Sequence, residues 1–262
     1  MSDDTQDYLY WMRTQGYYVV PDAIRDQALL ARLRSGIDRA VEEDETRAAD
    51  GTYRNFFAPG VARLLIDRDD AFVDLVQNSP VQDKIDLLLG DTCVLRNYSA
   101  VRLKPNVKNM ASNVHKDSPR FSPGYLLSVQ VLFFIDDFTA ETGATWLLPG
   151  SHNAEERPSD AQFFERGIRI FGKAGTALIF DSQLWHSGGD NVSPAPRRGV
   201  AVVYTRSFIK QEIDFARALS PETLAKLDDT GRRLIGWNVR VPASLEEFYL
   251  PESERLYKGG QG

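Results

Sequence analysis

Cysteine and histidine are scarce in this chain of 262 residues, which holds one cysteine and three histidines. The lone cysteine, Cys93, cannot form an intramolecular disulfide, so a reducing compartment is the simple expectation. No apolar run reaches the roughly 20 residues that span a bilayer, and the acidic N-terminus lacks the pattern of a secretion signal. These absences predict a cytoplasmic protein that does not enter a membrane.

Runs of positive charge are also missing. The formal net charge is −6, and lysines and arginines do not cluster into a stretch that could follow a phosphate backbone. Nucleic acid is therefore not an expected partner, whereas a small-molecule substrate is. Nothing in the sequence predicts an oligomeric state.

The first third of the chain has the residue spacing of helices. A helix is expected over residues 5–15, and a short strand over 17–21 follows it. Apolar residues then recur at helical spacing after Asp22, which is expected to cap the next helix. Further helical pattern over 68–90 is interrupted near Pro80.

After residue 90 the pattern changes to short β-rich segments separated by glycine and proline turns. Strands are expected within the stretches 92–105, 125–137, 143–152, 175–191 and 198–209. The stretch 125–137 is almost continuously apolar, which is typical of a strand buried on both faces. Helix returns at 220–236. Helices that flank a block of strands predict a mainly β fold, a jelly roll or barrel, in a single domain over residues 1–262.

One short segment combines an imidazole and a carboxylate, His115 and Asp117, two residues apart. In an extended chain, residues i and i+2 point to the same side, so these groups can converge on one point. A third candidate, His186, ends an apolar strand at a glycine turn. Two histidines and one carboxylate form the facial triad of non-haem Fe(II) oxygenases, which leaves positions on the metal open.

Each of these residues also has a simpler interpretation when it is taken alone. An H-x-D tripeptide is most often a surface histidine beside an acid, and a histidine at a strand end is often a turn residue. His152, in a P-G-S-H turn, is expected to support the fold rather than bind a metal. Arg197, eleven residues after His186, either caps an exposed strand or binds a carboxylate with its guanidinium fork. Taken together, His115, Asp117, His186 and Arg197 favour a metal site with a cationic residue that binds an anion beside it.

The order of these motifs resembles the phytanoyl-CoA dioxygenase family of Fe(II)/2-oxoglutarate oxygenases, which includes ectoine hydroxylase. The resemblance covers about residues 10–210 and is carried by "GYYVVPDAI" (16–24), "LKP" (103–105), "FFIDDFTAETGATWLLPGSH" (133–152) and "WHSGGDNVSPAPR" (185–197). It implies a double-stranded β-helix, a cupin-like jelly roll, with Fe(II) bound by His115, Asp117 and His186. It also implies that Arg197 binds the cosubstrate 2-oxoglutarate and that dioxygen is the oxidant.

Three further residues are expected to contact the cosubstrate. Gln130 occupies a position where the family often has a polar residue, and Lys104 and Arg102 lie on the strand before the triad. Gln130 is equally compatible with a hydrogen-bonded strand residue, and Arg102 with a contact to an acidic substrate. Where the family often has serine two residues after the distal histidine, this chain has Gly188, and its serine is Ser187. One cosubstrate hydrogen bond is therefore not expected from that position.

The reaction that this resemblance implies is hydroxylation of an unactivated C–H bond in a small polar metabolite or biosynthetic intermediate. Asp117 favours hydroxylation, because related halogenases lack a carboxylate at that position, although desaturation, epoxidation and ring closure use the same ligands. Two alternatives stay open: a cupin-like module that binds a small molecule without turnover, and a non-redox isomerase or hydrolase that uses a metal in the same site. Loops at 52–62, with Phe56 and Phe57, and at 106–124 are expected to form a lid.

Overall fold

The computed structural model describes residues 3–53, 58–107 and 112–257. Its elements, with η for 3₁₀-helices, are α1 (Asp3–Thr14), β1 (Tyr17–Val20), α2 (Gln27–Ala49), β2 (Val61–Arg63), η1 (Leu65–Asp67), α3 (Asp70–Gln77), α4 (Gln82–Leu89), β3 (Val94–Leu103), β4 (Ser128–Phe134), β5 (Thr145–Leu147), η3 (Ser151–Asn153), α5 (Asp160–Arg166), β6 (Ile168–Ile170), β7 (Ala177–Asp181), β8 (His186–Ser187), β9 (Arg197–Thr205), α6 (Phe215–Ala218), α7 (Pro221–Lys226), α8 (Asp229–Leu234), α9 (Leu245–Phe248) and η4 (Glu252–Glu254). Within these ranges, every helix is too short or too polar to cross a bilayer.

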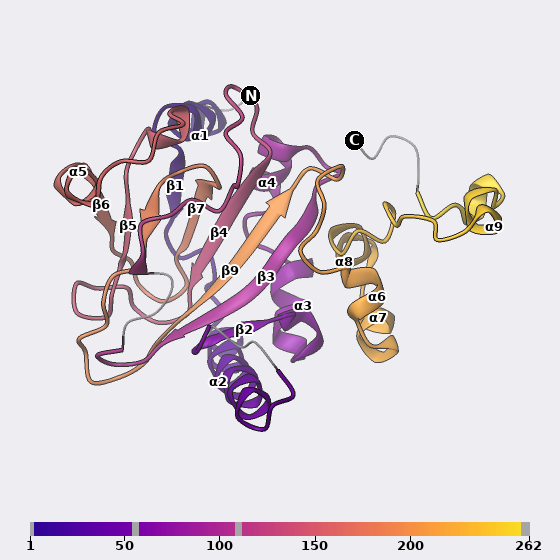
Figure 1. The fold of residues 1–262 in the computed structure, drawn as a ribbon, viewed down its shortest axis with the longest axis horizontal. Coiled ribbons are helices and arrows are strands. Elements are labelled where there is room, and N and C mark those ends of the chain that lie inside the picture. The colour runs from indigo at the N-terminus through magenta and orange to yellow at the C-terminus, as the bar shows by residue number, and fades with distance from the viewer. Residues whose placement is uncertain (1–2, 54–57, 108–111, 258–262) are drawn as a thin grey trace.

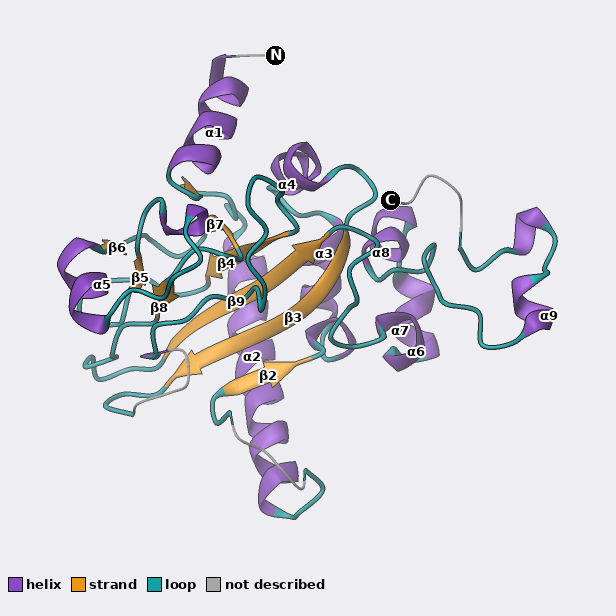
Figure 2. Cartoon of the chain, turned by 45° about the horizontal axis from the view of Figure 1, so that its top comes forward, coloured by secondary structure: helices purple, strands orange, loops and turns teal. Residues whose placement is uncertain are grey.

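Two antiparallel sheets lie at the centre of the fold (Figure 1). The large sheet has the strand order β1-β7-β4-β9-β3-β2, and the small sheet has the order β6-β5-β8. Helix α2 crosses one face of the large sheet (Figure 2), and its buried residues join the core that the sheet forms with α3 and α4. This arrangement confirms the jelly roll with flanking helices that the sequence predicts.

The alternation of side chains along β4 explains its nearly continuous apolar sequence. Val129, Val131 and Phe133 pack into the core on the helix side of the sheet. Leu132 and Phe134 point to the opposite face and belong to a second core between the two sheets. Both faces of the strand are therefore covered, and successive residues pack alternately into the first and the second core.

The start of α2 differs from the sequence-based expectation. Asp26, not Asp22, caps the helix, and its carboxylate accepts hydrogen bonds from the N–H groups of Ala28 (2.8 Å) and Leu29 (3.2 Å). The helix cannot begin earlier because the N–H of Ile24 donates to the carbonyl of Gly175 (2.8 Å), which holds that part of the chain extended. Asp22 lies in the preceding turn with a φ of 50°.

The expected helix at 220–236 is two short helices, α7 and α8. The break occurs because Asp228 caps α8, accepting a hydrogen bond from the N–H of Gly231 (2.7 Å). Ser220 caps α7 and also donates to Asp67 of η1 (2.7 Å), which ties this C-terminal region to the chain after β2. The helices beyond β9 are thus anchored to the body of the protein at α7.

Candidate metal centre

His115 and His186 are neighbours because their backbones pair. The N–H of His115 donates to the carbonyl of His186 (3.0 Å), and the N–H of His186 donates to the carbonyl of His115 (2.9 Å). This antiparallel bridge places the His115 segment beside β8, and the two imidazole rings have their centres 4.2 Å apart. Main-chain hydrogen bonds therefore fix the separation of two histidines that are distant in the sequence.

Asp117 completes the cluster. Its Oδ1 lies 3.8 Å from Nε2 of His115, and its Oδ2 lies 3.7 Å from Nε2 of His186. One donor atom of each residue lies within 4.8 Å of the other two. The Oδ2 atom is buried and accepts no hydrogen bond from the residues that the structure describes. Since an unpaired buried carboxylate oxygen is costly, the donor set and this free oxygen both fit a bound cation.

Backbone carbonyls orient both imidazole rings. The Nδ1 atom of His115 lies 2.7 Å from the carbonyl oxygen of Asn113, and that of His186 lies 2.9 Å from the carbonyl oxygen of Leu184. A carbonyl can only accept, so each Nδ1 carries the hydrogen and each Nε2 presents its lone pair toward Asp117. Burial lowers the pKa of the His186 imidazole more than the nearby Asp117 carboxylate raises it, which keeps the ring neutral near pH 7.

The three side chains differ in their access to solvent. The His186 side chain is 6% exposed, that of Asp117 is 21% exposed and that of His115 is 38% exposed. The cluster is therefore closed behind His186 and open beside His115. A substrate that reaches a metal here would enter from the His115 side.

Arg197, at the start of β9, is buried between the two sheets. It shares a strand face with Ala201 of the core between the sheets, because residues spaced by an even number point the same way. Its Nη2 donates to the carbonyl of Gly143 (2.9 Å) and its Nε to that of Thr142 (3.4 Å), while its guanidinium lies 3.9 Å from the centre of the Phe138 ring. No carboxylate forms an ion pair with it within the described ranges.

The charge on Arg197 is therefore uncompensated by a contact. Burial lowers the pKa of its guanidinium to about 9, and the more distant Asp136 opposes this only in part. A buried cation of this kind favours an anionic ligand. Two strand positions further on, a side chain at Gly199 would come within 3.5 Å of Nη1, so this glycine keeps space beside the guanidinium.

Gln130 lies on the same interior face of the large sheet. It pairs in register with Phe180 of β7 and Val203 of β9, and it is an even number of residues from Leu132 of the inter-sheet core. It is half-buried, and none of the hydrogen bonds found among the described residues involves its side chain. The structure thus brings Gln130 to the same space between the sheets as Arg197.

Arg102 and Lys104 are not brought to this site, which corrects the expectation that they contact the cosubstrate. Arg102 forms ion pairs with Asp38 (3.4 Å) and Glu42 (3.1 Å) of α2, and Lys104 pairs with Glu45 of the same helix (2.9 Å). Arg102 is an even number of residues from Ala100, which packs on the helix side. Its side chain therefore points to the face opposite the triad.

Arg96 approaches the metal ligands from β3. The pairing of β3 with β9 is irregular between Leu95 and Asn97, and such a bulge redirects a side chain. The Nη1 of Arg96 donates to the backbone carbonyl of Asp117 (3.4 Å), and its Nη2 pairs with Glu212 (3.1 Å). The sequence carries no signal for this contact, because neither the bulge nor the approach of Glu212 follows from local pattern.

His152, Ser187 and Lys116 have other contacts and do not join the triad. Nε2 of His152 lies 3.1 Å from the carbonyl of Arg13, in agreement with a role in the fold. Ser187 donates to the carbonyl of Ser112 (2.8 Å), so its hydroxyl holds the loop before His115. The ammonium of Lys116 lies 5.5 Å from the centre of the Trp185 ring. The proposed lid residues Phe56 and Phe57 lie outside the described residues.

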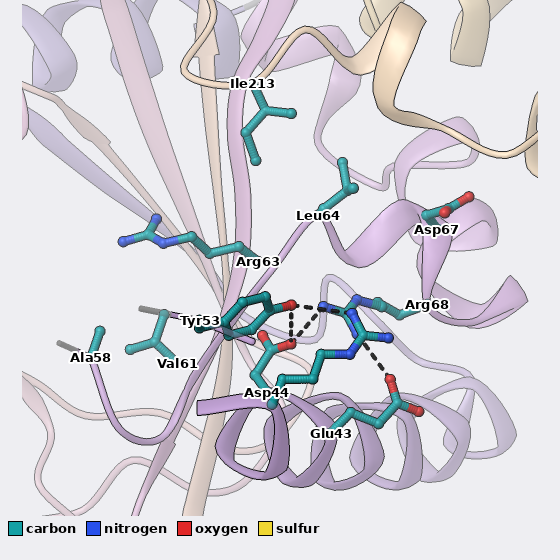
Figure 3. Close-up of a pocket in the computed structure, with 11 residues that line it drawn as sticks. Glu43, Asp44, Tyr53, Ala58, Val61, Arg63, Leu64, Asp67, Arg68 and Ile213 are labelled. Carbon is teal, nitrogen blue, oxygen red and sulfur yellow. Dashed lines mark hydrogen bonds and ion pairs between the residues drawn. The ribbon is translucent and has the colours of Figure 1, made fainter. Parts of the chain in front are cut away.

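A separate hollow of about 710 Å³ lies along the edge strand β2 (Figure 3). Within it, Arg68 pairs with Asp44 (2.6 Å) and Glu43 (2.9 Å), and the Tyr53 hydroxyl donates to Asp44 (3.3 Å). These contacts link α2 to the chain around η1. The carboxylates of Asp44 and Glu43 are already paired with Arg68, so we assign this hollow a structural role.

Comparison with known proteins places this geometry in a family. The family model for phytanoyl-CoA dioxygenase (PhyH) matches residues 12–199. The uncharacterized protein Rv1501 of Mycobacterium tuberculosis is 35% identical over 267 residues, which cover 99% of this chain and 96% of that protein. Dioxygenase af480 of Aspergillus fumigatus is 24% identical over 266 residues, covering 98% and 77% of the two chains.

The fold is also found among solved structures. The non-haem α-ketoglutarate-dependent epimerase SnoN from nogalamycin biosynthesis superposes with a TM-score of 0.63 at 16% identity. The match covers 83% of this chain and 88% of SnoN. At this identity the similarity establishes the jelly-roll fold and leaves the reaction to be argued from the site.

Proposed function

This chain belongs to the phytanoyl-CoA dioxygenase family, and on that premise we propose that it is an Fe(II)/2-oxoglutarate-dependent hydroxylase of a small organic substrate. In this proposal His115, Asp117 and His186 bind the iron and Arg197 binds the far carboxylate of 2-oxoglutarate. The observation that carries it is the convergence of three donor atoms within 4.8 Å of one another around a buried carboxylate oxygen that has no hydrogen-bond donor.

When bound, Fe(II) with 2-oxoglutarate and dioxygen supplies an oxidant that replaces C–H by C–OH, with succinate and carbon dioxide as coproducts. The residues of this chain hold that chemistry in place. The backbone carbonyls of Asn113 and Leu184 fix the two imidazoles, so their Nε2 atoms need no reorganisation to bind a metal. Three protein ligands on one side of an ion leave the other side for cosubstrate and oxygen.

Arg197 supports the choice of cosubstrate. Its guanidinium is fixed by two backbone carbonyls and by the Phe138 ring, and it has no carboxylate partner within the described ranges. A dicarboxylate that reached from the triad to Arg197 would satisfy both this cation and the metal. Gln130, on the same interior face, is the residue we propose to contact the cosubstrate between them.

Burial of the site keeps water away from the reacting groups, which protects a reactive oxidant from side reactions with water. His186 and Arg197 are both almost completely buried, so water is excluded from behind the metal and around the cosubstrate anchor. The more exposed His115 leaves one side for the substrate.

A second candidate function is an epimerisation that uses the same ligands. It is favoured by the fold shared with SnoN, whose reaction in nogalamycin biosynthesis is of that kind.

Anaerobic addition of Fe(II) and 2-oxoglutarate tests the proposal directly. A visible charge-transfer band is expected for the wild type, because 2-oxoglutarate chelates the iron, and it should be lost in His186→Ala. Admission of oxygen should then yield succinate. Absence of both signals from the iron-loaded wild type would contradict the proposal, and a binding module or a zinc enzyme would give that result. With a substrate in hand, a mass gain of one oxygen supports hydroxylation, and an unchanged mass with inverted stereochemistry supports epimerisation.

A further inference from the structure

The last part of the described chain projects from the body of the protein. We call residues 237–257, which follow α8, the C-terminal arm. In both Figure 1 and Figure 2 its helix α9 lies well away from the two sheets. The arm turns back on itself, because Val239 and Tyr257 form an antiparallel bridge. It lies beyond residue 199, where the family match ends.

This arm exposes an unusual amount of apolar surface. Helix α9 buries none of its residues, Phe248 is 61% exposed and Tyr249 is 76% exposed. Val241 and Leu245 are exposed as well. Single exposed apolar residues are ordinary in soluble proteins, but a contiguous group of this kind marks a binding surface. The arm is therefore expected to contact a ligand.

Val241, Phe248 and Tyr249 line a cavity of about 1020 Å³ between the arm and residues 207–212. Its apolar and aromatic lining includes Phe208, Val241, Phe248, Tyr249, Leu256 and Tyr257. This volume is at the upper end of the range for small-molecule sites, which are mostly apolar with few polar groups. A small polar metabolite would neither fill this space nor use its aromatic walls.

Two contacts join the cavity to the metal centre. Glu212 lines the cavity, and its carboxylate pairs with Arg96 (3.1 Å) and accepts a hydrogen bond from Asn97 (2.5 Å). Arg96 in turn donates to the backbone carbonyl of Asp117 (3.4 Å). The wall of the cavity is thus one side chain away from a proposed iron ligand.

We propose that this cavity binds the primary substrate, and that the substrate is a largely apolar organic molecule of several rings with polar groups at one end. The inference rests on the proposed function and specifies its substrate class, in place of the small polar metabolite expected from the sequence. The aromatic side chains of the arm pack against the ring system. Glu212, which is paired with Arg96, lies at the end of the cavity nearest Asp117, where its carboxylate accepts a hydrogen bond from a hydroxyl group next to the reacting carbon.

A neutral bicyclic dye, Prodan, serves as a probe, since its fluorescence reports transfer to an apolar site. The wild type is expected to bind it, and Phe248→Ala should weaken binding about ten-fold, because the ring contributes most of one buried aromatic contact. Tyr10→Ala removes a similarly exposed aromatic side chain, at 64%, from α1 and should leave binding unchanged. No binding by the wild type, or equal binding by both variants, would overturn the proposal.

The connection to the metal centre needs its own measurement. Mn(II) bound to the triad should broaden the proton NMR signals of bound Prodan, and Asp117→Ala should abolish the broadening but not the binding. Unbroadened signals would separate the cavity from the site. If Phe248→Ala changed only a concentration-dependent association of the protein, the arm would be a contact between copies, and the proposal would be wrong. If neither the wild type nor Tyr10→Ala formed succinate from 2-oxoglutarate, the proposed function would be contradicted, regardless of whether Prodan binds.

Discussion

Arg197 and Arg198 are adjacent in β9, yet they meet opposite electrostatic environments. Arg198 points to the helix side, where it pairs with Asp38 (2.8 Å) and Asp136 (3.0 Å), and the hydrogen bond to Asp38 is the main reason that its pKa is raised. Arg197 points between the sheets, where burial lowers its pKa to about 9. The same residue type therefore stabilises the fold on one face and is left free for a ligand on the other.

The contrast extends to the carboxylates. On the helix side, Asp136 accepts hydrogen bonds from Arg34 (2.8 Å) and from both the backbone and side chain of Arg198. Between the sheets, Oδ2 of Asp117 is buried without a donor. Paired charges mark the face of the large sheet that holds α2 in place, and unpaired charges mark the opposite face, where we propose that the metal and cosubstrate bind. Substitutions on the two faces should accordingly separate stability from ligand binding.

Asp117→Ala should have the largest effect. Loss of a proposed metal ligand is expected to reduce iron-dependent succinate formation by about 100-fold or more. The unfolding temperature of the metal-free protein should stay the same or rise, because the substitution removes an unsatisfied buried carboxylate. Succinate assays and thermal unfolding measure the two. Asp70→Ala, which removes an exposed carboxylate, is the control, and a destabilised Asp117→Ala protein with normal turnover would invert the comparison.

Arg197→Lys keeps the charge but loses the guanidinium fork. The dissociation constant of 2-oxoglutarate should rise by about 10- to 100-fold, since hydrogen bonds to charged groups contribute about 1.5–3 kcal/mol. Arg198→Lys is the matched control and should leave that constant unchanged. Isothermal titration with Fe(II) present measures both. Equal changes in this dissociation constant for Arg197→Lys and Arg198→Lys would contradict the assignment of Arg197 as the residue that binds 2-oxoglutarate.

The pKa of Arg197 also predicts a pH dependence. Burial lowers this pKa to about 9 in the ligand-free protein, so the cation is present at neutral pH and is progressively lost above that value. Affinity for 2-oxoglutarate should therefore be constant from about pH 7 to pH 8 and should weaken as the pH rises through 9. Titration across this range measures it. An affinity that rises with pH would contradict the assignment of Arg197 as the anchor.

Asp38→Asn should act on stability alone. Burial by itself raises the pKa of Asp38, but hydrogen bonds from Arg198 and Arg102 lower it below its usual range. A lowered native pKa stabilises the protein above the unfolded-state pKa of about 3.9, and this contribution is lost as the pH falls through the native value. Urea unfolding at pH 7 should show a loss of about 1–2 kcal/mol, which shrinks under acid conditions. A weakened affinity for 2-oxoglutarate would be unexpected.

Lys104→Ala should have the smallest effect. Its ion pair with Glu45 is on the surface, where such pairs contribute between about 0.2 and 1 kcal/mol. The affinity for 2-oxoglutarate should not change, because Lys104 reaches α2 and not the space between the sheets. Urea unfolding and titration of the cosubstrate check both statements. A clear loss of cosubstrate affinity would return Lys104 to the site.

The sequence predicts those parts of the molecule that depend on local pattern. The apolar run of β4, the interruption near Pro80 between α3 and α4, and the i, i+2 relation of His115 and Asp117 all follow from spacing alone. Asp22 and Asp26 illustrate the limit, because both are acids before a helical pattern and a hydrogen bond to distant Gly175 selects between them. Helix α5 was not predicted, although Ser159 and Gln162 form a capping box at its start.

The parts that depend on strand register could not be predicted. Which face of β3 carries Arg102 is decided by the pairing of β3 with β9 and by the bulge near Arg96. A shift of one residue would exchange the two faces of a strand, and no local pattern fixes that choice here. Glu212 meets Arg96 only after the whole sheet has formed, since more than a hundred residues separate them.

The backbone bridge between His115 and His186 has a consequence for how the protein responds to iron supply. Since hydrogen bonds between peptide groups set the spacing of the two imidazoles, the metal site is expected to form without a bound ion. We expect a chelator to leave a folded, dormant molecule that regains its capacity on simple addition of ferrous salt. A cell short of iron would then keep a reserve of this polypeptide rather than lose it to degradation, in contrast to domains that unravel without their metal.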